Sequence, residues 1–125
     1  MAKLLVVDDE ANIRTLIKKY AQYEGYEIIE AVNGIDAVAK CRTEDFDLIV
    51  MDVMMPEMDG LEAAKAIRAL DRPDAKAIPI IAMTANVFKE DREKCLAAGM
   101  NAHLSKPLDA ETMKRTISEQ LQKRK

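Results

Sequence analysis

Short apolar segments alternate five times with longer helical patterns along the chain, and this alternation restricts the fold more than any other feature of the sequence. The expected strands are Lys3–Asp8, Tyr26–Ala31, Asp47–Asp52, Ile78–Met83 and Ala102–Ser105. Nearly continuous apolar runs are typical of parallel strands that are buried on both faces. Strands joined by helical crossovers indicate a parallel sheet covered on both sides. Because a closed barrel of this type needs about eight such units, the sequence predicts an open, doubly wound α/β sheet.

The segments between the strands carry helical signals. The first has an amphipathic stripe and is expected to end at Gly25; the stripe consists of Ile13, Leu16, Ile17 and Tyr20. Further helices are expected to begin at Asn33–Gly34, to cover Leu61–Leu70 and Val87–Ala98, and to follow an N-cap at Asp109. Val87–Ala98 is densely charged, so we expect it to be weakly anchored. No linker or low-complexity tract divides the 125 residues, which predicts one domain over residues 1–125.

Bulk properties exclude several classes of protein. The formal net charge of -3 gives no reason to expect direct nucleic-acid binding. No apolar run approaches the roughly 18 residues that cross a bilayer, and no signal peptide is evident, so we expect a cytoplasmic protein without direct membrane contact. Cys41 and Cys95 form no CxxC motif and are expected to be reduced thiols. With His103 as the one histidine, a zinc site has little support.

Polar side chains stand at the carboxyl ends of four of the five expected strands. Asp8 and Asp9 follow the first strand, Asp52 ends the third, Thr84 follows the fourth and Lys106 follows the fifth. Ligands of open parallel sheets bind beyond these ends of the strands. We therefore expect three carboxylates, a hydroxyl and an ammonium group to converge at one edge of the fold.

The charge of this cluster predicts a metal ion. Three neighbouring carboxylates repel one another, and the single ammonium group of Lys106 leaves about two negative charges unbalanced. Mg²⁺ fits that deficit, because it binds a few carboxylates together with water and phosphate. The alternative is that these aspartates are only helix N-caps.

A metal-loaded carboxylate suggests a reaction. An ionised Asp52 can attack phosphorus and form an aspartyl phosphate without an additional base. Such a transfer depends mainly on positioning and on stabilisation of charge. Mg²⁺ and Lys106 can hold the phosphoryl oxygens, and Thr84 offers a neutral donor.

Four linked motifs resemble the receiver domain of two-component response regulators. They are Asp8-Asp9-Glu10, Met51–Gly60, Met83-Thr84-Ala85 and Ser105-Lys106-Pro107. The resemblance runs over essentially the whole chain, in order and with the spacing of the family. It implies a flavodoxin-like (βα)5 fold whose five parallel strands have the order 2-1-3-4-5.

The resemblance also implies roles for the acidic residues. Asp52 would be the phosphoacceptor, and Asp9 and Asp52 would ligate Mg²⁺ directly. Asp8 would act largely through water, and Met54 would offer its backbone carbonyl group.

Further roles are implied on the fourth and fifth strands. Thr84 would bind the phosphoryl group and Lys106 would pair with it, while Pro107 would follow a cis peptide bond. In this family the position of His103 is usually Tyr or Phe, which swings inward as the threonine moves and changes the face made by helix four, strand five and helix five. Here His103 is either this switch residue or an exposed strand residue without a role.

A phosphohistidine donor is the implied partner, either a histidine kinase or a histidine phosphotransfer domain. The chain would catalyse its own phosphorylation and dephosphorylation rather than act as a conventional enzyme, either as a stand-alone regulator or as part of a hybrid histidine kinase. The sequence identifies no downstream effector. The alternatives are a receiver-like interaction module that takes no phosphate, a flavodoxin-like electron carrier and a metal-dependent phosphohydrolase.

Overall fold

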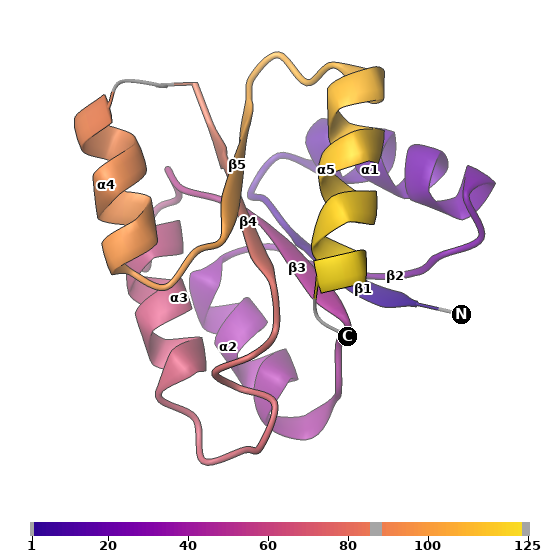
Figure 1. Cartoon of the computed structure of the whole chain (residues 1–125). Coiled ribbons are helices and arrows are strands. Elements are labelled where there is room, and N and C mark those ends of the chain that lie inside the picture. The colour runs from indigo at the N-terminus through magenta and orange to yellow at the C-terminus, as the bar shows by residue number, and fades with distance from the viewer. Residues whose placement is uncertain (1, 86–88, 124–125) are drawn as a thin grey trace.

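A computed structural model describes residues 2–85 and 89–123, which form a five-stranded parallel sheet with helices on both faces (Figure 1). The strands are β1 (Lys3–Val7), β2 (Glu27–Ala31), β3 (Leu48–Asp52), β4 (Ile80–Thr84) and β5 (Ala102–Ser105). Their order in the sheet is β2-β1-β3-β4-β5, and all four pairings are parallel. This confirms the predicted fold class and strand order.

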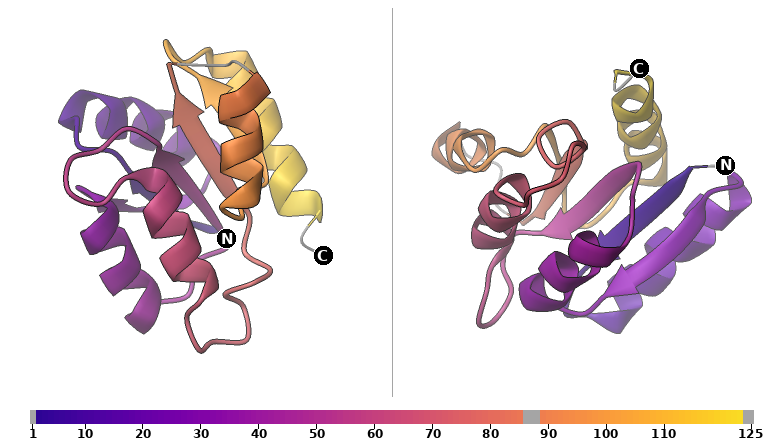
Figure 2. Two further views of the ribbon diagram at one scale, coloured as in Figure 1. Left: turned by 90° about the vertical axis from the view of Figure 1, so that its left-hand side faces the viewer. Right: turned by 90° about the horizontal axis from the view of Figure 1, so that it is seen from below.

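Helices follow each of the strands in turn and cover the sheet on two sides. They are α1 (Ala11–Tyr23), α2 (Gly34–Thr43), α3 (Gly60–Arg68), α4 (Lys89–Ala97) and α5 (Ala110–Lys123). Figure 2 shows them on both sides of the twisted sheet. Residues of α1 and α5 share one hydrophobic cluster, and residues of α2, α3 and α4 share the other. Val87, where the sequence places the start of the fourth helix, lies outside the described residues.

Alternation along the strands separates the two hydrophobic clusters. In β1, Leu4 and Val6 face α1 and α5, whereas Leu5 and Val7 face the other helices. All four side chains are fully buried. A parallel strand between two helical layers has no face exposed to solvent, which is why its sequence is continuously apolar.

Local signals set several helix ends. Gly25 has φ +86° after α1, a conformation that glycine adopts without strain. The N–H of Gly25 donates to the carbonyl of Gln22, and the N–H of Tyr26 donates to the carbonyl of Ala21. The turn therefore closes as a Schellman motif. Carboxylate or amide side chains accept an amide hydrogen bond at the N-termini of three helices; these caps are Asn33, Asp59 and Asp109.

The start of β4 and the burial of Leu16 differ from the sequence-based expectation. β4 begins at Ile80 rather than Ile78, because Pro79 has no N–H to donate to the ladder and contributes only its carbonyl, which accepts from Ile49. Leu16, expected in the buried stripe of the first helix, is 47% exposed. The inner face of α1 is instead marked by the buried Ile17 and Ala21.

The described residues contain no helix that could cross a membrane. Cys41 and Cys95 are both buried, and neither forms a disulfide bond. Burial raises the pKa of the Cys41 thiol to about 11, which keeps it protonated and unreactive.

Candidate functional site

The carboxyl ends of four neighbouring strands bring together the residues that the sequence singles out. Asp8 directly follows β1, Asp52 ends β3, Thr84 ends β4 and Lys106 directly follows β5. Asp8, Asp52 and Thr84 are 0%, 3% and 6% exposed. Burial of two acids in so small a region is costly unless other groups compensate their charge, so the cluster requires cations.

Lys106 supplies a cation to both acids. Its Nζ lies 3.1 Å from Oδ2 of Asp8 and 3.3 Å from Oδ2 of Asp52. The backbone N–H of Lys106 donates to the carbonyl of Thr84 at 2.9 Å, and the Lys106–Pro107 peptide bond is cis. The ammonium group therefore joins two acids that come from different strands.

The turn after β1 is closed by its own acidic side chain. Oδ1 of Asp8 accepts the N–H of Glu10 at 2.9 Å, and the N–H of Asp8 donates to the carbonyl of Ala31 at 3.3 Å. The carbonyl of Asp8 accepts Nη1 of Arg14 at 2.7 Å. Sequence reasoning assigned no role to Arg14, because its position on α1 gave no sign of this contact.

Asp52 is held by its own loop and approached closely by a glycine. Its Oδ1 accepts the N–H of Met54 at 3.3 Å, while the side chain of Met54 is 75% exposed. A Cβ atom on Gly60 would lie 2.3 Å from the carbonyl oxygen of Asp52, so only glycine fits there. The start of α3 thus fixes the backbone of the candidate phosphoacceptor.

Burial and mutual repulsion control ionisation in this cluster. Burial, reinforced by the charge of Asp8, raises the pKa of Asp52 to about 6, although Lys106 opposes the shift. Burial also raises the pKa of Asp8. Burial alone would lower the pKa of Lys106, but its hydrogen bond to Asp8 and the charges of both acids outweigh this effect and raise it. The single positive charge of Lys106 therefore does not fully compensate the negative charges of Asp8 and Asp52.

A divalent cation fits this arrangement. Carboxylate oxygens of Asp8, Asp9 and Glu10 all lie within 4.8 Å of one another, and Asp52 is linked to Asp8 through the shared lysine. Hard oxygen donors with excess negative charge match the preference of Mg²⁺. Glu10 also belongs to this group of carboxylates. The sequence interpretation treated Glu10 only as part of a motif, but the turn that Asp8 closes places its carboxylate close to those of Asp8 and Asp9.

His103 lines two cavities beside β5. It sits on β5 opposite Ala82 and is partly buried. One cavity of about 150 Å³ separates it from α4 and is lined by Arg92, Cys95 and Leu96 among others. Another of about 230 Å³ lies beside Pro107 at the approach to α5. His103 therefore borders empty space shared with α4 and empty space shared with the segment that leads into α5.

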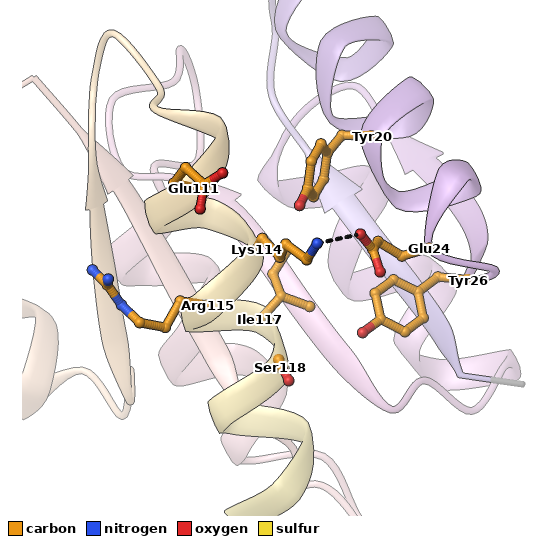
Figure 3. Close-up of a pocket in the computed structure, with 8 residues that line it drawn as sticks. All are labelled: Tyr20, Glu24, Tyr26, Glu111, Lys114, Arg115, Ile117 and Ser118. Carbon is orange, nitrogen blue, oxygen red and sulfur yellow. Dashed lines mark ion pairs between the residues drawn. The ribbon is translucent and has the colours of Figure 1, made fainter.

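A separate cavity of about 310 Å³ lies between α1 and α5 and contains none of the predicted site residues (Figure 3). Tyr20 and Tyr26 form one wall, and the buried Ile117 lies on the side of α5. Nζ of Lys114 and Oε1 of Glu24 form an ion pair of 3.1 Å across it. Its mixed lining shows no preference for one charge.

Comparisons with known proteins agree with this geometry. A family model described as the response regulator receiver domain matches residues 4–118. The chain is 34% identical to Probable histidine kinase 1 of Oryza sativa subsp. indica, with 96% of this chain and 15% of that protein covered. It is 44% identical to the transcriptional regulatory protein ResD of Bacillus subtilis, with 84% and 42% covered. The chain thus spans less than half of either relative.

Solved structures resemble the chain over nearly its full length. The chemotaxis response regulator CheY4 of Vibrio cholerae has a TM-score of 0.90 at 37% identity, with 96% of this chain and 98% of that chain covered. The receiver domain of sensor histidine kinase PA1611 from Pseudomonas aeruginosa, solved with a magnesium ion in its active-site cleft, has a TM-score of 0.87 at 35% identity, with 96% and 97% covered. With its sheet order, its acidic edge and these matches, the chain belongs to the response regulator receiver family of two-component and phosphorelay signalling.

Proposed function

We propose that Asp52 accepts a phosphoryl group from a phosphohistidine donor when Mg²⁺ is present. The observation that carries the proposal is Lys106, whose ammonium group lies between the buried Asp52 and Asp8 at the carboxyl edge of the sheet. Two relatives with similar sequences are histidine kinases that contain a matching segment, which supports a histidine kinase or phosphotransfer domain as the donor.

Asp8, Asp9 and Asp52 would hold Mg²⁺, with the backbone carbonyl of Met54 as a further ligand and Asp8 acting largely through water. When bound, the ion offsets the negative charge that gathers on the phosphoryl oxygens. The turn that brings Asp8 and Asp9 together also brings Glu10 within reach, so Glu10 is available to bind a water of the ion.

Asp52 acts as the nucleophile in the transfer. One of its carboxylate oxygens forms a bond to phosphorus as the bond between phosphorus and the donor's imidazole nitrogen breaks, and the imidazole leaves with that electron pair. The N–H of Met54 holds Oδ1 of Asp52, which limits the motion of the carboxylate. Lys106 exchanges its contact with Asp52 for a phosphoryl oxygen, because the charge then lies on that group.

Thr84 and His103 would change position when Asp52 is phosphorylated. Thr84 ends β4 within the buried edge, and its hydroxyl would bind a phosphoryl oxygen. His103, which lines two cavities beside β5, would turn inward as the threonine moves. The face made by α4, β5 and α5 would change as a shift between two populations, and a partner would bind one of them.

Phosphorylation on the carboxylate is tested with a small phosphoryl donor. The chain is incubated with acetyl phosphate and Mg²⁺ and followed by intact mass spectrometry. We expect a phosphoryl mass gain in the wild type and none in Asp52→Asn. Asp71→Asn, a change at an exposed acid outside the cluster, serves as the control and should be labelled normally. Equal labelling of Asp52→Asn would refute the assignment.

We place the domain in the cytoplasm, where histidine kinases hold ATP. The proposal is supported by the likeness of the chain to response regulators and histidine kinases. Fluorescence of a tagged chain in fractionated cells tests it, and recovery in the membrane or periplasmic fraction would contradict it.

A further inference from the structure

Arg14 links the acidic turn to α1 and β2. Its Nη1 donates to the carbonyl oxygen of Asp8 at 2.7 Å, and its Nε donates to Oε1 of Glu30 at 3.1 Å. The Arg14 side chain is only 15% exposed. Charge-assisted hydrogen bonds are stronger where water is largely excluded. The guanidinium group therefore has a fixed orientation, with Glu30 on one edge and the backbone of Asp8 on another.

Helix stability does not explain the position of Arg14. α1 begins at Ala11, so Arg14 lies near its N-terminal end, where a positive charge gains nothing from the helix dipole. The first turn of α1 contains no acidic residue, and the side chain of Glu10 makes no cap. Both hydrogen-bond partners of the Arg14 side chain lie outside α1. Its position is therefore explained by tertiary contacts.

The carbonyl that Arg14 binds belongs to the peptide between Asp8 and Asp9. The orientation of this peptide determines the directions in which both carboxylates leave the chain. The N–H of Asp8 is held by Ala31 and its Oδ1 by the N–H of Glu10. Arg14 adds the third fixed point, and with it the turn has little freedom to rotate.

We infer that Arg14 is a positioning residue that orients the Asp8–Asp9 peptide for Mg²⁺ binding, with Glu30 orienting Arg14 in turn. This inference rests on the proposed function. Partners that orient metal ligands commonly change metal affinity by about 10- to 100-fold when they are removed. Arg14 acts here through the backbone of one ligand and does not itself touch the ion.

A magnesium titration of the full chain tests this role, with backbone amide chemical shifts as the measurement. We expect Arg14→Gln to weaken Mg²⁺ binding by about tenfold or more. Arg14→Lys should recover part of the affinity, because an ammonium group can donate to the Asp8 carbonyl but cannot also match the geometry of Glu30. Lys18→Gln is the matched control: Lys18 lies on the same helix with its Nζ 3.7 Å from Oε2 of Glu30, whereas the hydrogen bond to the Asp8 carbonyl comes from Arg14.

Labelling by acetyl phosphate gives a second measurement. In Arg14→Gln the Mg²⁺ concentration for half-maximal labelling should rise by the same factor, while the rate at saturating Mg²⁺ stays within about twofold of wild type, because the nucleophile is unchanged. Hydrogen exchange at the Glu10 amide, which bonds to Asp8, should quicken in this variant and not in Lys18→Gln. A purely structural role would lower thermal stability and leave the Mg²⁺ midpoint in place.

Two outcomes separate the inference from the proposed function. If the wild type binds Mg²⁺ and is labelled, but both Arg14 variants bind Mg²⁺ within twofold of wild type, the positioning role is overturned and the phosphoacceptor remains. If the wild type neither binds Mg²⁺ nor is labelled, both are overturned. Should Arg14→Gln fail to fold, Arg14→Lys and Glu30→Gln decide the question in the same titration.

Discussion

Lys106 and Asp8 are separated by 98 residues in the chain, yet Nζ of the lysine lies 3.1 Å from Oδ2 of the aspartate. The contact closes the acidic edge of the sheet from the β5 side. It also explains how two buried acids are tolerated, since the same ammonium group lies 3.3 Å from Asp52.

Loss of this ammonium group should destabilise the chain when no metal is present. In Lys106→Met, the carboxylates of Asp8 and Asp52 stay buried without a cation, and we expect the free energy of unfolding at pH 7.5 to fall by roughly 2 kcal/mol. Urea denaturation in EDTA measures this. Addition of Mg²⁺ should restore part of the loss, because the ion replaces the missing charge. Lys65→Met, a change at an exposed lysine of α3, is the control. Equal stability of Lys106→Met and wild type in EDTA would contradict the expectation.

The raised pKa of Asp52 predicts how stability depends on pH. The carboxyl group has a pKa of about 6 in the folded chain and about 4 when unfolded. Between these values the folded state keeps a proton that the unfolded state releases, so the free energy of unfolding decreases as the pH rises from about 4 to about 6. Asp52→Asn has no charge to bury. In EDTA the variant should exceed the wild type by on the order of 2 kcal/mol at pH 7.5, and the gap should narrow toward pH 4.5.

The control for this pH series is Asp71→Asn, which changes an exposed acid and should track the wild type at every pH. A wild type that gains stability over Asp52→Asn as the pH rises would show that Asp52 is better solvated in the folded chain than its burial indicates.

The sequence predicted the convergence of acids, threonine and lysine because each follows or ends a parallel strand. In such a sheet all carboxyl ends lie at one edge, so position along the chain was enough to place Asp8, Asp52, Thr84 and Lys106. The alternation of apolar runs likewise predicted the layers and the (βα)5 topology.

Other features depended on tertiary contacts that the local pattern does not record. The Arg14 side chain is held between the Asp8 carbonyl and Glu30 of β2, and Gly60 needs to be glycine only because α3 begins against the backbone of Asp52. Leu16 satisfied the periodicity of a buried stripe but is exposed, since the sheet covers a narrower part of α1 than the stripe assumed. The sequence pattern therefore predicts the helices and strands, whereas packing determines which of their side chains are buried.

Gly60→Ala should impair both stability and phosphorylation. The added methyl group would lie 2.3 Å from the carbonyl oxygen of Asp52, so the backbone of Asp52 must shift. We expect a loss of about 2 kcal/mol in the free energy of unfolding and slower labelling by acetyl phosphate even at saturating Mg²⁺.

Gly25→Ala is the control for Gly60→Ala, because it strains the backbone without a contact to Asp52. Gly25 has φ +86° and no atom within 4 Å of an added Cβ, so alanine there should cost about 1 kcal/mol without changing the labelling rate. If both variants are labelled at the wild-type rate, the close approach of Gly60 does not position Asp52.

His103→Ala should separate phosphorylation from the response of the α4 face. His103 does not contact the acidic cluster, so the rate of labelling by acetyl phosphate should stay within about twofold of wild type. His103 lines both the cavity beside Cys95 and Leu96 and the one beside Pro107, and alanine would leave more space there. Because His103→Ala has no ring to turn inward, the amide chemical-shift changes of residues 92–97 on addition of beryllofluoride and Mg²⁺ should be markedly smaller than in the wild type.

Ser105→Ala, at an exposed position of the same strand, is the control and should keep the full response. A full response from His103→Ala would mean that β5 and α4 respond to Asp52 without the imidazole, and His103 would then be a strand residue without a switching role.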